Sequence, residues 1–489
     1  MLVTAAQGSS SPGAYTDIPA RLDRLPWSAW HWRVVIALGV AWMLDGLEVT
    51  LVGSFGSILE RPETLGLTAA EVGWAGSLYI GGAVIGALVF GRLADLLGRK
   101  KLFLITLTVY MAATLATGLS TETWFFVLCR FATGLGIGGE YAAINSAIDE
   151  LVPARVRGRV SLAINGSFWL GAALGAGLSL LLLDDAIVRV EWGWRLGFIL
   201  GSVLALAIVL VRRGVPESPR WLLVHGRADE AERIVADIES RVAMECGPLP
   251  AVPDGARIRL GASAAPRLGQ IVHVLLHTYR RRSGVAFALM VSQAFFYNAI
   301  FFTYALVLTR FYGVPDTRVG LYIFPFALGN VLGPLVLGPL FDRVGRRKMI
   351  ALTYILAGVG LAMTGWAFLE GWLDARSQAI CWSAVFFLAS AAASSAYLTV
   401  SEVFPLEMRA LAISLFYAVG TGAGGVVGPV LFGALIESGE PAAVAAGYGF
   451  AAALVIVAGF IALRFAVDAE RRSLEDISPP LTGVHREPL

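Results

Sequence analysis

Long apolar runs recur through almost the whole chain of 489 residues, and they constrain the fold more than any other feature. Many windows exceed about 18 apolar residues, enough for a helix to cross the hydrocarbon core of a bilayer. Hydrophobic residues make up 57% of the chain and charged residues 15%, whereas about a quarter of the residues of a soluble protein are charged. The sequence therefore predicts an all-α protein that crosses a membrane many times.

The apolar runs predict twelve transmembrane helices, six on each side of one long polar segment. These spans are expected at 34–58, 72–94, 102–119, 123–150, 158–183, 194–211, 284–310, 318–340, 349–369, 378–403, 410–436 and 444–466.

The polar segment 213–282 is expected to be a linker between two bundles. Its charge pattern predicts one amphipathic helix over 228–245 and another near 271–282, with a Pro- and Gly-rich loop at 247–267 between them. The first 20 residues and the chain beyond 467 are expected to be loosely held. The expected domains are an N-terminal segment 1–33, a six-helix bundle 34–212, the linker 213–282, a second six-helix bundle 283–467 and a tail 468–489.

Two short basic stretches indicate that the second half of the chain is a diverged copy of the first. Residues 91–101 read GRLADLLGRKK and residues 338–348 read GPLFDRVGRRK, with Gly, Asp, Gly and a basic triplet at the same spacing. A second pair follows in the same order, ELVPARVRG at 150–158 and EVFPLEMRA at 402–410. Two such halves side by side predict pseudo-symmetric bundles with a cavity between them.

Basic residues gather in the loops on one side of the expected membrane. Loops after even-numbered spans or before odd-numbered ones hold Arg92, Arg99, Lys100, Lys101, Arg155, Arg157, Arg159, Arg343, Arg346, Arg347, Lys348 and Arg409. The opposite loops are short and mostly acidic or neutral. By the positive-inside rule we expect a plasma-membrane protein with both termini in the cytoplasm. No cleavable signal peptide is apparent, because the first apolar run is too long for a signal core.

Several motifs that could suggest a cofactor or an enzyme have simpler explanations. GLGIGG at 134–139 and GTGAGG at 420–425 fit a dinucleotide-binding pattern, but each lies inside an expected span, where small residues let helices approach closely. None of the three lysines is followed by Ser or Thr, as a phosphate-binding loop requires. The three cysteines are isolated. We expect no enzymatic activity, cofactor, metal site or nucleic-acid partner.

Four ionisable residues lie within the expected spans of the first half. Asp45 and Glu48 share one face of the first span, while Arg130 and Glu140 lie in the fourth. A charge in hydrocarbon is costly, and a carboxylate that faces an arginine can alternate between an ion pair and a protonated acid. These residues are therefore candidates for proton coupling. A static Glu48–Arg130 pair that only fixes helix packing is the alternative.

Uncharged polar groups within the spans are candidates for binding a small polar ligand. Amides can orient such a ligand by hydrogen bonds while neighbouring rings stack on it. Hydrogen bonds between helices would use the same residues and remain the alternative. The candidates are Asn165, Trp169, Gln293, Tyr297, Asn298 and Asn330.

Together these motifs resemble the major facilitator superfamily, and within it the sugar porter-like branch of metabolite:proton symporters. The stretches 91–101 and 338–348 resemble its loops after the second and eighth helices. PESPRWL at 216–222 is similar to the motif after the sixth helix of sugar porters, EVFP at 402–405 to the motif after the tenth, and RSLEDI at 472–477 to the end of the C-terminal signature.

This resemblance implies two six-helix bundles, alternating access and short helices in the linker. It also implies that Glu48 accepts a proton with Arg130 as its partner, and that Gln293, Asn298 and Asn330 hold substrate. The cytoplasmic residues implied to form a network that locks the outward-facing state are Asp95, Arg99, Glu150, Arg157, Asp342, Arg346, Glu402 and Arg409.

Departures from the sugar-porter pattern leave the substrate open. Ala392 stands where sugar porters have a tryptophan, and 468–472 is a degraded form of their signature. The acid at Asp45 and the buried Glu140 look more like those of organic-acid and niacin-type carriers. We expect a proton symporter, monomeric in the bilayer, for a sugar-like polyol or an organic acid. An uncoupled facilitator and a non-transporting membrane sensor are the alternatives.

Overall fold

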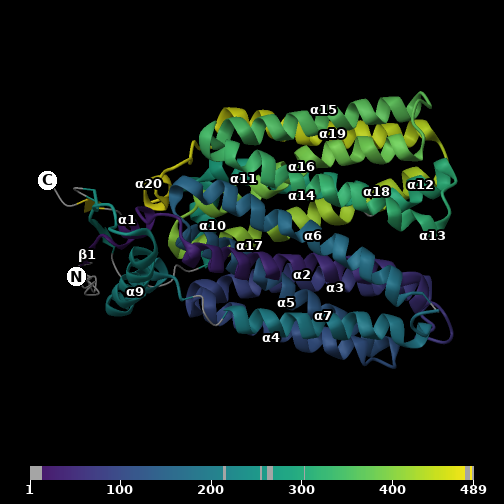
Figure 1. Cartoon of the computed structure of the whole chain (residues 1–489). Helices are drawn as coiled ribbons and strands as arrows, with labels where there is room; N and C mark the ends of the chain where they lie inside the picture. The colour runs from purple at the N-terminus through teal and green to yellow at the C-terminus, as the bar shows by residue number, and fades with distance from the viewer. Residues whose placement is uncertain are drawn as a thin grey trace, which may run out of the picture.

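Two bundles of six long helices form the protein, and Figure 1 shows them packed lengthwise side by side. The computed structural model describes residues 14–184, 186–212, 216–253, 256–260, 268–301, 303–479 and 485–486. The first bundle contains α2 (Ala29–Leu59), α3 (Ala69–Leu97), α4 (Arg99–Gly118), α5 (Thr123–Leu151), α6 (Arg157–Leu182) and α7 (Val190–Arg212). The second contains α11 (Arg280–Phe301), α14 (Ile323–Arg343), α15 (Arg346–Leu369), α16 (Ala375–Val403), α17 (Arg409–Gly420) with α18 (Val426–Glu437), and α19 (Pro441–Phe465).

The twelve predicted spans and the two-bundle fold are confirmed. By length and hydropathy alone, ten segments of the described chain can cross a membrane, and α5 and α7 complete the first bundle by packing against α3, α4 and α2. Large apolar side chains such as Trp124, Leu335 and Val430 are exposed on the outside of the helices. Exposed apolar surface of this kind is what contact with lipid requires.

Two spans of the second bundle are less regular than the sequence predicts. The seventh, expected as one helix over 284–310, is interrupted after Phe301 and resumes as α12 (Tyr304–Tyr312). Two short turns, α13 (Asp316–Val319) and η3 (Gly320–Tyr322), then lead into α14. The eleventh span contains a π-helical turn, η5 (Thr421–Gly425), between α17 and α18. The Gly-rich sequence TGAGG permits this turn, and such turns are frequent at functional sites.

Small residues allow the helices to pack closely, as the sequence predicts for the motif 134–139. A Cβ atom at Gly134 would lie 2.0 Å from the carbonyl oxygen of Tyr79, and one at Gly138 would lie 1.9 Å from that of Ala83. Both glycines therefore mark the contact between α5 and α3. The motif is a helix-packing surface.

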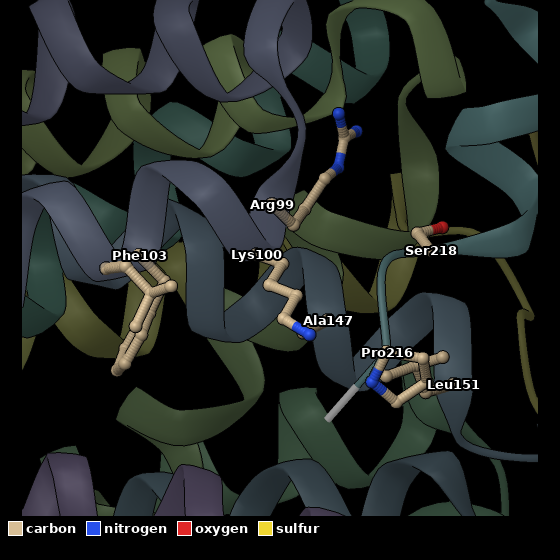
Figure 2. Close-up of a pocket in the computed structure, with 8 residues that line it drawn as sticks. Arg99, Lys100, Phe103, Ala147, Leu151, Pro216 and Ser218 are labelled. Atoms are coloured by element: carbon tan, nitrogen blue, oxygen red, sulfur yellow. The ribbon is translucent and has the colours of Figure 1, made fainter. Parts of the chain in front are cut away.

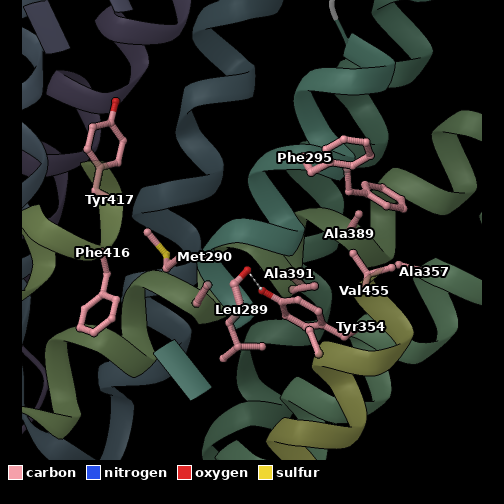
Figure 3. Packing of buried hydrophobic residues seen from close by; sticks show 14 of the residues in the cluster. Leu289, Met290, Phe295, Tyr354, Ala357, Ala389, Ala391, Phe416, Tyr417 and Val455 are labelled. Atoms are coloured by element: carbon pink, nitrogen blue, oxygen red, sulfur yellow. Dashed lines mark hydrogen bonds between the residues drawn. The ribbon is translucent and has the colours of Figure 1, made fainter. Parts of the chain in front are cut away.

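Buried aliphatic and aromatic side chains fill the second bundle. Figure 3 shows Leu289 of α11 beside Tyr354 of α15, whose hydroxyl donates a 3.1 Å hydrogen bond to the Leu289 carbonyl. Phe295 and Val455 extend this core toward α19. Tyr417 of α17 lies apart from that group in the same view, toward the first bundle.

The linker and the segments next to the termini gather at one end of the bundles, here called the linker end (Figure 1, left). They form α1 (Ile18–Asp23), α8 (Pro219–Val224), α9 (Ala228–Cys246), α10 (Leu268–His273), the π-helical turn η2 (Val274–Thr278) and α20 (Leu474–Ile477). A three-stranded antiparallel sheet joins β1 (Ala14–Thr16), β2 (Ile258–Leu260) and β3 (His485–Arg486) in that order.

These elements confirm the amphipathic helix predicted at 228–245 and correct three other expectations. The segment 271–282 is split among α10, η2 and the start of α11, and β2 lies within the expected loop. In the described parts of these segments the chain is not loosely held: Ile18 at the start of α1 is buried, and α20 in the tail is docked through Glu475. Local composition missed both because the stabilising partners are distant in sequence. Residues 1–13 lie outside the described part of the chain.

Candidate functional site: a linker-end network and a central cavity

At the linker end, each bundle provides an aspartate that caps a helix of the other bundle. Asp95, near the end of α3, accepts hydrogen bonds from the backbone amides of residues 410 and 411 (3.3 and 3.1 Å) at the start of α17. Asp342, near the end of α14, accepts them from residues 158 and 159 (3.0 and 2.8 Å) at the start of α6. Both carboxylates meet the positive end of a helix dipole, so these contacts join the bundles.

An arginine next to each aspartate extends this arrangement. In the first half, Arg99 lies 3.2 Å from Asp95 and 3.1 Å from Glu150, with all three side chains buried. Glu150 also lies 3.9 Å from Arg409 of the second half. The interaction therefore crosses between the bundles.

The second half repeats the same geometry. Arg346 lies 2.8 Å from Asp342 and 3.0 Å from Glu402. Glu402 in turn lies 3.6 Å from Arg157 of the first half. All eight residues predicted for the network are thus brought together, and this set is called the linker-end network below.

Two glutamates that the sequence analysis missed support the network. Glu217 accepts hydrogen bonds from the backbone amides of Arg99 and Lys100 (3.0 and 3.2 Å) at the start of α4, and Glu470 accepts one from Arg346 (3.2 Å) at the start of α15. Figure 2 shows Pro216 and Ser218 on the loop that passes beside Arg99 and Lys100 at that end of α4. Each glutamate follows the last helix of its bundle, and this shared position is the signal that could have found them.

The linker and the tail meet at Arg220. Its guanidinium lies 2.9 Å from Glu475 of α20 and 3.4 Å from Asp23 of α1. Burial raises the pKa of Asp23, although Arg220 and Arg157 oppose that effect. For Glu475, burial is the largest influence and acts in the same direction, but Arg220, a backbone hydrogen bond and Arg409 together lower the pKa below its ordinary value.

Within the first bundle, Glu48 and Arg130 form a buried ion pair of 2.6 Å, as the sequence predicts. The Arg130 guanidinium also lies over the ring of Tyr79, 4.6 Å from its centre, and 5.5 Å from that of Phe198. Such a cation–π contact stabilises a desolvated arginine further. The second carboxylate oxygen of Glu48 makes no hydrogen bond within the described chain.

Asp45 and Glu140 are buried beside this pair. Asp45 is 2% exposed, lies one helical turn before Glu48, and is within electrostatic reach of both Glu48 and Glu140. Among the described residues, no basic side chain comes within 4 Å of Asp45. Three carboxyl groups thus lie in this buried region of the first bundle, and Arg130 is paired with Glu48.

A cavity of about 210 Å³ lies between the bundles next to this acidic cluster. Tyr141 follows Glu140 directly, and its ring lies 4.5 Å from Trp42 of α2 and 4.3 Å from Tyr417 of α17. None of the described residues that line the cavity is charged. Its aromatic lining consists of Trp42, Tyr141, Phe168, Trp169, Tyr297, Phe301, Tyr397 and Tyr417.

Three of the predicted amide side chains line the cavity, namely Asn165, Gln293 and Asn298. Asn165 donates to the Ser161 carbonyl (2.8 Å) and Asn298 to the Ala294 carbonyl (2.7 Å), each one turn earlier in its own helix. The Asn165 carbonyl oxygen has no partner in the part of the chain that is described. That oxygen is itself buried, so it does not face the open volume of the cavity.

Asn330 does not line the cavity, contrary to the sequence-based expectation. It is fully buried behind Tyr297, whose hydroxyl donates a 2.6 Å hydrogen bond to the Asn330 side-chain oxygen. The amide nitrogen of Asn330 bonds to the Phe326 carbonyl (2.9 Å). Asn330 therefore orients Tyr297, which together with Trp169 forms part of the lining.

Sequence reasoning missed most of the aromatic lining, including Trp42, Tyr141, Tyr397 and Tyr417. Aromatic residues are common in transmembrane helices, so their type alone does not distinguish lipid-facing positions from cavity-facing ones. The proximity of Trp42 to Asp45 and of Tyr141 to Glu140 is the signal that could have found two of them. Within the described residues, no cluster of His, Cys, Asp and Glu could hold a metal ion.

Comparison with known proteins identifies relatives that transport small molecules. Residues 53–480 match the family described as "Sugar (and other) transporter". The niacin transporter NiaP of Acinetobacter baylyi is 28% identical over 85% of this chain and 89% of its own, and the 4-hydroxybenzoate transporter PcaK of Pseudomonas putida is 27% identical over 72% and 75%. A structure of the proton:xylose symporter XylE shares the fold, with a TM-score of 0.75 and 18% identity over 92% of this chain and 98% of its own.

Proposed function

The chain belongs to the sugar (and other) transporter family of the major facilitator superfamily, and we propose that it carries a small aromatic metabolite across the membrane together with protons. It is a multi-pass membrane transporter and not an enzyme. The proposed substrate is a single ring with polar substituents, within the organic-acid class. The observation that carries this proposal is an uncharged, aromatic cavity beside a buried cluster of carboxyl groups.

The size and lining of the cavity support a ring-shaped substrate. A volume of about 210 Å³ is below the range of roughly 300–1,000 Å³ typical of pockets for drug-sized ligands. Tyrosine and tryptophan rings can stack on a planar ligand, and each such pair contributes about 0.5–1.5 kcal/mol beyond its area. The amide side chains of Asn165, Gln293 and Asn298 in the lining can orient the polar substituents of such a ring. Transport of niacin and 4-hydroxybenzoate by the relatives agrees with this class.

Proton coupling follows from the charge of such a substrate. An aromatic carboxylate would enter a cavity without a cation among its described lining, and Arg130 is already engaged by Glu48. A buried, unpaired carboxylate is strongly disfavoured. A proton taken up by the substrate or by the Asp45, Glu48 and Glu140 cluster offsets that cost. Release of Glu48 from Arg130 would then link protonation to movement of α2 against α5.

We propose that the linker end faces the cytoplasm and that the linker-end network closes this side while the cavity opens to the other. The clustering of lysine and arginine in the linker-end loops supports the orientation in a plasma membrane, and the crossed helix caps support the closing role. Breaking these contacts would open the cavity to the cytoplasm by rocking of the two bundles, which is alternating access. A monomer contains both halves of this site.

An uncoupled facilitator is the second candidate, because the good geometry of the Glu48–Arg130 pair also suits a static role. A neutral polyol would fit that function, since it needs no compensating charge. The xylose symporter shares the fold, but at 18% identity it does not indicate a substrate.

Purified protein in liposomes that contain a pH-sensitive dye tests the proposal. Candidate substrates are nicotinate, 4-hydroxybenzoate, gallate, xylose and myo-inositol, with Glu48→Gln beside wild type. We expect an aromatic acid to acidify the lumen with wild type, whereas Glu48→Gln still exchanges labelled substrate without proton movement. If labelled substrate enters wild-type liposomes without protons, the protein is an uncoupled facilitator. If only xylose or myo-inositol is taken up, the proposed aromatic substrate is wrong.

A further inference from the structure

The linker-end network contains one carboxyl group that its internal symmetry does not explain. Asp149 precedes Glu150 on α5, and the matching position before Glu402 on α16 is Ser401. The two halves are otherwise equivalent here, each with one aspartate, one glutamate and two arginines. Asp149 is therefore an additional acid on one side only.

Asp149 is completely buried at the contact between the bundles. In the described chain, neither of its carboxylate oxygens has a hydrogen-bond partner, and no basic group lies within 4 Å of it. The groups that face it from other helices are Arg157 of α6, Arg409 of α17, and Glu402 with Ser401 of α16. Both of these arginines already interact with a glutamate, at 3.6 and 3.9 Å.

The charges of the buried network do not balance if Asp149 is ionised. With Asp149 added to the eight residues of the linker-end network, four arginines face five carboxyl groups, namely Asp95, Asp149, Glu150, Asp342 and Glu402, while the neighbouring Arg220 is paired with Glu475. An excess negative charge away from water is costly, and a carboxyl group avoids this cost by binding a proton.

The contacts of the other four acids indicate which of the five holds the proton. Asp95 and Asp342 each accept two backbone amides and pair with an arginine. Glu150 and Glu402 each lie within 4 Å of two arginines. Each of these four acids therefore has partners of the kind that a carboxylate requires in a buried site. Among the described residues, Asp149 has no arginine within 4 Å and its oxygens accept no hydrogen bond, although the charges of Arg157 and Arg409 act on it from farther away.

We propose that Asp149 is a proton-binding residue of the linker-end network: it carries a proton while the bundles are joined there and releases it when they separate. The inference rests on the proposed opening of this end during transport, but not on the identity of the substrate or on coupling through Glu48. Separation would expose Asp149 to water, where an aspartate is ionised at neutral pH. Since the closed form binds one proton more, acid on the linker side favours closure.

The neutral Ser401 at the symmetric position agrees with this assignment. The same contact in the other half is made by an uncharged side chain, so the closed interface tolerates a neutral group there. A protonated Asp149 is uncharged, as that serine is, whereas an ionised Asp149 carries a negative charge. The pH dependence therefore belongs to one half of a symmetric structure.

Distances between spin labels test this proposal in full-length protein in lipid nanodiscs. Labels are placed at Lys101→Cys and Lys348→Cys, which are exposed on α4 and α15, in a background with all three native cysteines replaced by serine. From pH 5.5 to 8.5 without substrate, we expect the open-to-closed ratio of the otherwise wild-type protein to rise up to ~10-fold per pH unit, the limit for one proton. Asp149→Asn and Asp149→Ser should abolish this rise and remain mainly closed.

A position swap guards against a merely structural effect of the substitutions. Asp149→Ser combined with Ser401→Asp moves the acid to the symmetric site, and we expect it to restore the pH dependence. A wild-type pH profile in Asp149→Asn would overturn the proposal, as would an unchanged distance distribution in wild type at all pH values. The dye assay of symport is a separate measurement, so a failure of proton-coupled transport and a failure of the Asp149 assignment are distinguishable.

Discussion

The two bundles are alike at the linker end and different in their middle. Both contribute the same aspartate, arginine and glutamate contacts to the network. At the level of the cavity, the first bundle buries Asp45, Glu48, Arg130 and Glu140. The second bundle has no Asp, Glu, Lys or Arg within 284–301, 323–341, 349–369, 377–401, 410–436 or 441–463.

This difference indicates that both halves still contribute equally to joining the bundles, whereas proton binding and substrate binding are divided between them. Contacts that hold the bundles together need both halves equally, so they remain symmetric. Proton binding needs buried charge, whereas holding an uncharged or neutralised ring needs aromatic surface and amides. We infer that the first bundle responds to protons and that the second mainly orients the substrate.

The largest effect is expected from Arg130→Leu, which leaves Glu48 buried without its partner. Removing one member of a buried ion pair typically costs about 3–5 kcal/mol, so the free energy of unfolding should fall by that amount. The matched control is Gln293→Leu in the second bundle, which should cost less because it removes no charge. The double variant Arg130→Leu with Glu48→Leu should recover most of the stability. Equal losses of unfolding free energy in Arg130→Leu and Gln293→Leu would contradict the proposed difference between a charged first bundle and an uncharged second bundle.

A smaller and symmetric effect is expected from Asp95→Asn and Asp342→Asn. Each removes a charge-assisted cap from a helix of the other bundle, a contact of about 1.5–3 kcal/mol. The open population measured by spin-label distances should therefore rise by roughly 10- to 100-fold in both variants, since ~1.4 kcal/mol is tenfold. A large effect in one variant and none in the other would show that the halves are not equivalent at this end.

Tyr297→Phe tests the role of the second bundle in orienting substrate. It removes the hydrogen bond to Asn330, which contributes about 0.5–1.5 kcal/mol, so substrate affinity should weaken roughly 2- to 10-fold. Tyr312→Phe removes a comparable 3.0 Å bond to Gln378 away from the cavity and serves as the control. Isothermal titration calorimetry measures the substrate affinity of both variants. Equal substrate affinities in Tyr297→Phe and Tyr312→Phe would argue against Tyr297 as a substrate contact.

The smallest effect concerns the docked tail. Burial raises the pKa of Glu475, but Arg220, a backbone hydrogen bond and Arg409 together lower it below its ordinary value of 4.5. The ionised form therefore stabilises docking above pH 4.5, and this contribution is lost as the pH falls through the lowered pKa. Hydrogen exchange of residues 474–477 should be faster at pH 3.5 than at pH 6 once corrected for intrinsic rates. Glu475→Gln should remove this pH dependence. If the ratio of the exchange rates at pH 3.5 and pH 6 is the same in Glu475→Gln as in wild type, ionisation of Glu475 does not stabilise the docked tail.

The sequence predicted those features that rest on composition and on the internal repeat. Twelve spans follow from hydropathy, and the partners of Arg99 and Arg346 are implied by the resemblance to the major facilitator superfamily that the repeated motifs carry. Asn330 was misplaced because spacing along α14 does not reveal that Tyr297 lies in front of it. The docked tail was missed because its stability depends on Arg220, 255 positions away from Glu475. Contacts between distant segments depend on tertiary packing, which local pattern does not encode.

The crossed helix caps also constrain how the protein is made. While the first bundle emerges alone during synthesis, the start of α6 lacks Asp342 and Asp95 lacks its helix. The start of α6 gains its cap, and Asp95 gains its helix, only when the second bundle has been inserted beside the first. The helix caps can therefore form only after the second bundle is in place, and a chain that ends before residue 410 would keep the Asp95–Arg99 ion pair but lack the cap on α17.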